Sequence, residues 1–118
     1  MVMLLSWFAY FKGWVLKDFK NISPQEAHAL LENSHNITLV DVRSKKEFDK
    51  DHLEGAVSFP LENLSELNVT ASKLLVYSER GELSVDAARI LSNRGYKVLN
   101  LEGGVVFWIR GGYKVVED

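Results

Sequence analysis

Three short apolar runs, separated by segments with helical patterns, constrain the fold of this chain more than any other feature. They occupy residues 37–42, 73–77 and 97–101 and are rich in β-branched and aliphatic side chains. Runs this short and this apolar are typical of strands that are buried on both faces of a parallel sheet. Because helical segments alternate with the runs, we expect a three-layer α/β/α domain with a mostly parallel central sheet.

Local signals indicate where the helices begin. Ser23, Pro24 and Glu26 have the pattern of a capping box with proline at the first helical position. A longer helix is expected over residues 84–93, with Ser84 as its cap. Shorter elements are expected as helices over residues 44–50, 61–67 and 107–109 and as a brief strand over residues 55–60.

The first 20 residues form an apolar segment, which we predict to be helical, ahead of a domain over residues 21–118. Ser6 is the single polar side chain in residues 1–11. The run is shorter than the roughly 20 apolar residues that span a bilayer. Three interpretations remain open: a helix packed on its own domain, a helix packed on or exchanged with a second copy in a homodimer, or a helix on a membrane surface. The missing signal-peptide pattern favours a cytoplasmic location, with peripheral membrane association under the last interpretation.

Composition excludes several classes of site. The 118 residues contain no cysteine, which excludes disulfides, thiolate-ligated metals and every mechanism that uses a protein thiolate. His28, His35 and His52 form no pair at metal-ligand spacing, so we expect neither a metal nor a cofactor. The formal net charge of −2 argues against a nucleic-acid partner, because phosphate binding needs clustered Lys and Arg.

Several ordered motifs resemble those of the rhodanese family. Residues 41–43 read Asp-Val-Arg and residues 51–56 read Asp-His-Leu-Glu-Gly-Ala. Residues 101–104 read Leu-Glu-Gly-Gly, and Trp108 and a Gly-Tyr-Lys-Val stretch at residues 112–115 follow. The resemblance covers about residues 22–116. It implies a rhodanese-like fold, a ligand loop after the strand at residues 73–77, and a supporting role for Asp41 and Arg43 as an ion pair.

The ligand loop departs from the family pattern, which normally reads Cys-x-x-Gly-x-Arg-Ser. The corresponding residues here are Ser78, Glu79, Arg80, Gly81, Glu82, Leu83 and Ser84. Ser78 replaces the cysteine and Leu83 replaces the arginine, while the glycine and the last serine match. Backbone N–H groups of such a turn favour anions and lower the pKa of a cysteine thiol. A serine hydroxyl cannot form the persulfide of sulfur transfer.

We therefore expect a rhodanese-like module without thiosulfate sulfurtransferase activity that binds a protein partner or a small anion. Glu79 and Glu82 make the loop less favourable to anions, although Glu82 also suits a helix N-terminus. One alternative is a sulfurtransferase-family enzyme whose nucleophile has been replaced by Ser78, naturally or by engineering. Another is an accessory protein that oligomerises or binds membranes through residues 1–20. A hydrolase with Ser78 as nucleophile would need a base, for which His52 and Asp41 are the candidates. The family resemblance implies supporting roles for both residues instead, which argues against a hydrolase.

Overall fold

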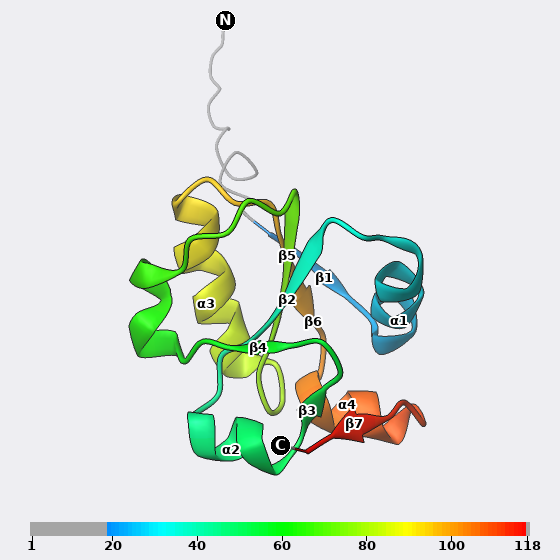
Figure 1. Cartoon of the computed structure of the whole chain (residues 1–118). Coiled ribbons are helices and arrows are strands. Elements are labelled where there is room, and N and C mark those ends of the chain that lie inside the picture. The colour runs from blue at the N-terminus through cyan, green and yellow to red at the C-terminus, as the bar shows by residue number, and fades with distance from the viewer. Residues whose placement is uncertain (1–18, 118) are drawn as a thin grey trace, which may run out of the picture.

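The computed structural model describes residues 19–117, in which strands and helices alternate as expected (Figure 1). In chain order the elements are β1 (Phe19–Ile22), α1 (Pro24–Asn33), β2 (Ile37–Asp41), α2 (Lys45–Lys50), β3 (His52–Leu53), β4 (Val57–Ser58), the 3₁₀-helix η2 (Leu61–Glu66), β5 (Lys73–Tyr77), α3 (Glu82–Asn93), β6 (Val98–Leu101), α4 (Gly104–Arg110) and β7 (Val115–Val116). The predicted capping box of α1 is confirmed, since Ser23 Oγ accepts from Glu26 N–H and Glu26 Oε1 accepts from Ser23 N–H.

The central sheet has the strand order β1-β6-β5-β2-β4, and each neighbouring pair is parallel. The register aligns Asp41 at the end of β2 with Tyr77 at the end of β5. Because the strands run in the same direction, the segments that follow β2, β5 and β6 meet at one edge of the sheet. Strands β3 and β7 form a separate antiparallel pair.

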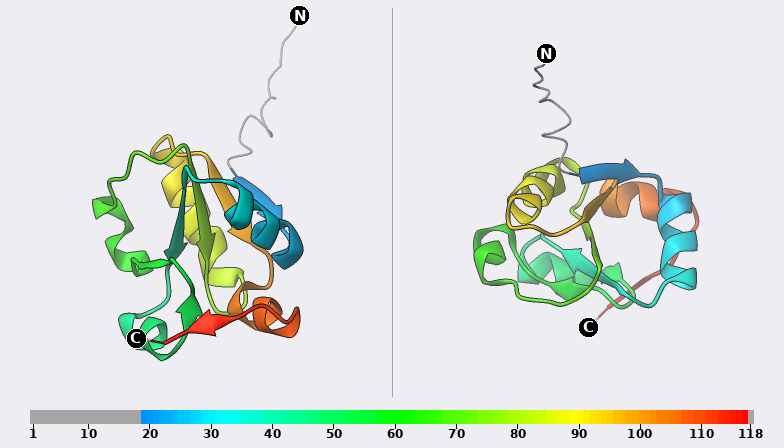
Figure 2. Two further views of the ribbon diagram at one scale, coloured as in Figure 1. Left: turned by 45° about the vertical axis from the view of Figure 1, so that its right-hand side comes forward. Right: turned by 90° about the horizontal axis from the view of Figure 1, so that it is seen from above.

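Helices lie on both sides of this sheet (Figure 2). A cluster of buried apolar side chains packs on each of its faces. In β5, Leu74 and Val76 pack with the cluster that includes residues of α3 and η2, whereas Leu75 and Tyr77 pack with the cluster that includes residues of α1 and α4. This alternation follows from the two-residue period of a strand. It confirms the three-layer α/β/α fold with a mostly parallel sheet.

Residues 1–18 lie outside the described residues. Most of the segment that we predicted to be helical is therefore not described, nor are the homodimer contact and the membrane-surface contact proposed for it. Phe19 and Lys20 pair with Val98 and Leu99 in the parallel ladder of β1 and β6. The helical prediction was therefore wrong for these two residues, because β6 offers a pairing partner that the local pattern does not reveal. Within residues 19–117, no helix has both the length and the apolar character needed to cross a membrane.

Two predicted boundaries also differ. The strand expected over residues 55–60 is only the two-residue β4. Helix α3 begins at Glu82 rather than at Ser84, with Gly81 at the N-cap in a left-handed conformation (φ 93°). The prediction that Ser84 caps this helix was therefore wrong. Ser84 lies in the first turn, where its own N–H is bound by a hydroxyl from the preceding loop.

Candidate functional site

Ser78 lies at the centre of the loop between β5 and α3, and its side chain is held there by the loop itself. The residue is buried, with 2% of its surface exposed. Its Oγ accepts hydrogen bonds from the N–H groups of Gly81 (3.2 Å) and Ser84 (3.1 Å). The hydroxyl donates to Ser84 Oγ at 3.1 Å. The inward-pointing amides expected of this loop are therefore present, and two of them are already bound by Ser78.

The turn before α4 holds the loop from the other side. The N–H groups of Val105 and Val106 donate to the carbonyl oxygens of Ser78 and Glu79, both at 3.0 Å. This approach needs a glycine at position 104, where φ is +58° and a Cβ atom would lie 2.2 Å from Ser78 O. The two motifs singled out in the sequence, the ligand loop and the glycine pair at residues 103–104, thus lie in direct contact.

Asp41 and Arg43 form the predicted ion pair at the end of β2. Asp41 is fully buried and Arg43 is 3% exposed. The guanidinium donates to the carboxylate through Nε at 3.1 Å to each oxygen and through Nη2 at 2.8 Å. The backbone N–H of Arg43 donates to the same carboxylate at 2.9 Å. The supporting role expected from the family resemblance is consistent with this buried network.

Arg43 also reaches the ligand loop. Its Nη1 lies 3.0 Å from Glu79 Oε1 and 3.3 Å from Asp51 Oδ1, and its Nη2 donates to the Asp51 carbonyl. Burial by itself lowers the pKa of the Arg43 guanidinium, but its hydrogen bonds with Asp41 and the charge of that carboxylate raise the pKa above its ordinary value. Arg43 is therefore a permanent cation whose donors are already bound by three acidic residues.

Tyr77 completes the network beneath the loop. Its ring is fully buried, and its hydroxyl oxygen accepts from the N–H of Leu53 at 3.1 Å. Burial, together with the nearby negative charge of Asp41, raises the pKa of the Tyr77 hydroxyl above its ordinary value. Tyr77 thus remains a neutral donor and acceptor that joins β5 to β3.

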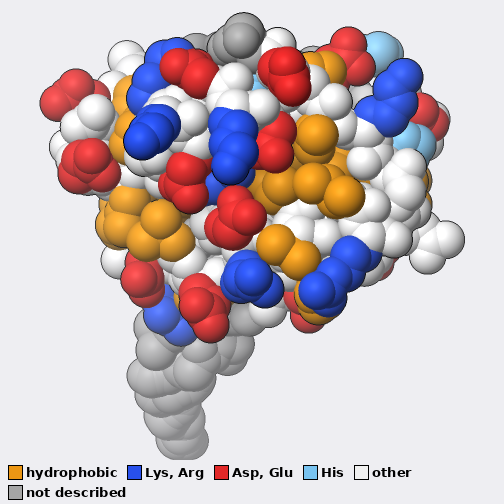
Figure 3. Space-filling model, turned by 90° about the horizontal axis from the view of Figure 1, so that it is seen from below, with side chains coloured by type: hydrophobic (Ala, Val, Ile, Leu, Met, Phe, Trp, Pro, Cys, Tyr) orange, Lys and Arg blue, Asp and Glu red, His pale blue; other side chains and the backbone are white. Residues whose placement is uncertain are grey.

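A hollow of about 290 Å³ opens in front of the loop. It is lined by residues of the loop and of the segment after β2, namely Arg43, Glu47, Ser78, Glu79, Arg80, Glu82 and Leu83. The lining thus holds the three carboxylates of the glutamates and the two guanidiniums of Arg43 and Arg80. The Arg43 guanidinium is already paired with acidic residues. Figure 3 views this end of the molecule and shows acidic and basic side chains intermingled, with apolar patches beside them. The hollow is not a concentrated basic site.

The arrangement limits the chemistry that the loop can support. His52, a candidate base in the sequence, is buried with its ring stacked on Phe48 at 3.8 Å and its Nδ1 2.8 Å from Phe48 O. It does not line the hollow. Within the described residues, no cluster of three or more His, Asp and Glu side chains is placed to hold a metal ion.

The structure brings together most of the residues that the sequence pointed to. Ser78, Gly81 and Ser84 share one hydrogen-bond network. Asp41 and Arg43 form a second network, which reaches the same loop at the Glu79 carboxylate. Leu83, in the position of the family arginine, is 40% exposed at the rim. The sequence reasoning did not assign Glu47, Asp51 and Tyr77 to the site. Asp51 lies in the stretch at residues 51–56 that resembles the family, and this was the available signal for it.

The sequence of this chain is similar to those of known proteins. Residues 23–110 match the rhodanese-like domain family. The chain is 31% identical over 97 residues to the thiosulfate sulfurtransferase GlpE of Stutzerimonas stutzeri, which covers 79% of this chain and 87% of that protein. It is also 31% identical over 84 residues to a probable molybdopterin-synthase adenylyltransferase of Porphyra purpurea, where it spans only 22% of the longer protein.

A solved structure shares the fold. The crystal structure of a rhodanese-related protein from Thermoplasma volcanium matches with a TM-score of 0.75 and 26% sequence identity, covering 85% of this chain and all of that one. The family match spans most of the chain, since it covers residues 23–110 of 118. This chain therefore belongs to the rhodanese-like domain family.

Proposed function

We propose that this chain is a rhodanese-like module that works by binding a protein partner at the ligand loop, without sulfur transfer. The observation that carries the proposal is the side chain at the centre of the loop. A hydroxyl, that of Ser78, takes the hydrogen bonds of the Gly81 and Ser84 amides, and the chain has no cysteine anywhere.

The chemistry of sulfur transfer supports this assignment. A thiolate attacks the sulfane sulfur of a donor and keeps that sulfur as a persulfide. A cysteine thiol, with an ordinary pKa of about 8.5, ionises readily when backbone N–H groups surround it. An alcohol is not ionised at neutral pH, and its oxygen does not form a stable bond to a sulfane sulfur. The scaffold of the site is retained, while its nucleophile is replaced.

The charges of the hollow favour a protein partner over a free anion. Arg43, one of the two cations that line the hollow, is bound by Asp41, Asp51 and Glu79. Glu47 and Glu82 add negative charge to the lining, which leaves Arg80 as the remaining cation there. A small anion thus meets repulsion from three carboxylates, whereas an arginine or lysine of a partner meets attraction. We assign the hollow to a basic group of a partner protein.

Two measurements test the proposal. The purified chain, incubated with thiosulfate and cyanide, is expected to give thiocyanate at the rate of the buffer alone. Clear turnover by the unaltered chain would refute the absence of sulfur transfer. Turnover confined to a Ser78→Cys variant would instead place the chain among sulfurtransferases whose nucleophile has been exchanged.

The binding half of the proposal is tested by NMR on the ¹⁵N-labelled chain. A short acetylated peptide with two arginines is expected to shift the amide signals of residues 78–84 saturably, and Glu82→Gln is expected to weaken that shift. Asp86→Asn, which removes a charge one helical turn further along α3, is the matched control. Saturable shifts with thiosulfate or phosphate, and none with the peptide, contradict the assignment to a partner protein.

A further inference from the structure

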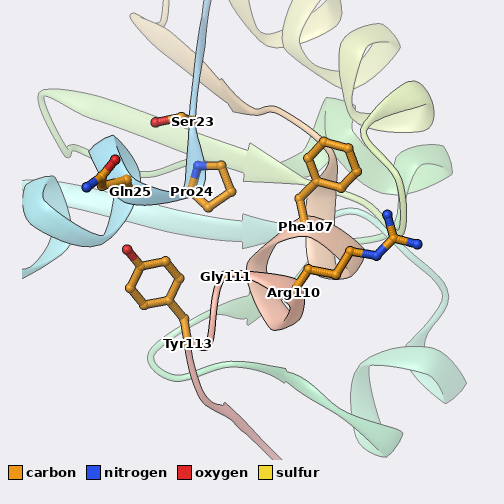
Figure 4. A pocket seen from close by; sticks show the side chains of 7 residues that line it. All are labelled: Ser23, Pro24, Gln25, Phe107, Arg110, Gly111 and Tyr113. Atoms are coloured by element: carbon orange, nitrogen blue, oxygen red, sulfur yellow. The ribbon is translucent and has the colours of Figure 1, made fainter.

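A second hollow, away from the ligand loop, lies between the start of α1 and helix α4. Its volume is about 530 Å³. Figure 4 shows Ser23, Pro24 and Gln25 on one side, Phe107 and Arg110 on α4, and the ring of Tyr113 directed toward the start of α1. We refer to the hollow lined by these residues as the α1–α4 groove. It shares no lining residue with the hollow in front of Ser78.

Phe107 gives this groove an exposed apolar wall. The Phe107 residue is 47% exposed, whereas Trp108, next to it on α4, is 5% exposed and belongs to the core. The ring covers the turn at Gly103, where a Cβ atom would lie 2.1 Å from Phe107 Cγ. Phe107 therefore closes off the backbone beneath it but leaves much of its own ring in solvent. Exposed aromatic surface that lines a hollow is a common feature of recognition sites.

Arg110 places a charge at the rim of the groove, beside Phe107, with its guanidinium directed away from Tyr113 (Figure 4). It is the one charged side chain among the residues that line it, and its guanidinium lies 5.8 Å from the centre of the Phe107 ring. Within residues 19–117, no carboxylate pairs with Arg110, in contrast with Arg43, which has three acidic partners. A free guanidinium beside an aromatic ring complements a carboxylate next to an apolar group. The groove therefore has the opposite charge preference to the ligand loop.

The groove continues past Tyr113. A neighbouring hollow of about 540 Å³ is also lined by Tyr113, together with apolar residues such as Leu31 and Leu53 and with the charged residues Glu32, Glu54 and Lys114. His28 stacks on the Tyr113 ring at a centroid distance of 4.5 Å and supports the boundary between the two hollows. Two adjoining hollows on either side of one aromatic ring fit an extended chain, which places successive side chains in each.

We infer that the α1–α4 groove docks an extended segment of another protein, in which an aromatic or aliphatic side chain stands within a few residues of an Asp or Glu. The apolar side chain packs between Pro24, Phe107 and Tyr113, and the carboxylate binds Arg110. This interaction is separate from the one proposed for the ligand loop, and it holds whether or not the chain transfers sulfur.

A peptide-display selection on the full chain tests the inference, followed by affinity measurements on the selected peptides. Selected peptides are expected to carry an apolar residue close to Asp or Glu. Arg110→Glu is expected to lower their affinity by about tenfold or more, as the loss of a charge-assisted pair implies. Arg89→Glu is the matched control, because Arg89 is also exposed and lies 5.9 Å from an aromatic ring, that of Phe19.

Exchanging the charges sharpens the test. A selected peptide in which the acidic residue is replaced by lysine is expected to bind Arg110→Glu more tightly than it binds the unaltered chain. The inference is overturned if selection yields no binding peptide, if the selected peptides lack acidic residues, or if Arg110→Glu and Arg89→Glu reduce affinity equally. Peptides that lose affinity with Glu82→Gln but not with Arg110→Glu would place binding at the ligand loop instead.

Discussion

Replacing Asp41 by asparagine tests whether the buried ion pair supports the ligand loop. Asp41 is fully buried and accepts from the side-chain Nε and Nη2 of Arg43, itself 3% exposed. Removing one partner of a buried pair typically costs about 3–5 kcal/mol, because the other charge stays buried without compensation. Arg43 keeps its contacts with Asp51 and Glu79, which are more exposed, so we expect the lower end of that range.

A loss of about 3 kcal/mol leaves a domain of ordinary stability, about 5–15 kcal/mol, still folded in water. The measurement is urea unfolding followed by far-ultraviolet circular dichroism. Asp49→Asn is the matched control, since it removes the same charge from an exposed pair with Lys45 and is expected to cost less than about 1 kcal/mol. The double variant Asp41→Asn/Arg43→Met is expected to recover part of the loss, because no buried guanidinium is then left without the Asp41 carboxylate.

The outcome that contradicts this reasoning is a cost for Asp41→Asn below about 1 kcal/mol, equal to that of the exposed control. Such a result would mean that Asp51, Glu79 and solvent compensate Arg43 without Asp41. A double variant less stable than Asp41→Asn alone would also contradict it, since the guanidinium left without Asp41 would then not be the source of the loss.

Three further predictions concern the loop and its surroundings. Gly104→Ala is expected to lower the free energy of unfolding by about 3 kcal/mol, from overpacking against Ser78 O and from positive φ. Gly112 also has a positive φ, but a Cβ atom added there would meet no atom within 4 Å, so Gly112→Ala is expected to lower the free energy of unfolding by only about 1 kcal/mol. Equal losses for the two variants in urea unfolding would contradict the proposed clash between residue 104 and Ser78 O. The single thiol of Ser78→Cys is expected to have a pKa below about 8.5, as measured from the pH dependence of its alkylation by iodoacetamide. A higher pKa would show that the loop amides do not stabilise an anion. Because the pKa of Tyr77 is raised in the folded chain, the unfolded chain loses the Tyr77 proton at a lower pH, and the free energy of unfolding is expected to fall as the pH rises above 10.0. In a titration followed by absorbance at 295 nm, the Tyr77 phenolate is expected to appear only when the chain unfolds.

The sequence alone predicted the features that depend on near neighbours. The apolar runs at residues 37–42 and 73–77 became the buried strands β2 and β5, because their composition suits a strand covered on both faces. The capping box at Ser23 and Glu26 formed as expected, since it needs only residues three positions apart. The absence of cysteine, and with it of a thiolate, was also readable without any structure.

Tertiary structure decided what depends on residues far apart in the chain. Phe19 and Lys20 form a strand because β6 lies beside them, although their own segment reads as helical. The Gly81 conformation, which local spacing did not reveal, moves the start of α3 and lets Ser78 bind the Ser84 amide. Arg43 meets Glu79 only because parallel strands end at the same edge of the sheet. A local pattern records propensity and capping within a few residues, whereas these contacts exist only once the sheet has brought distant loops together.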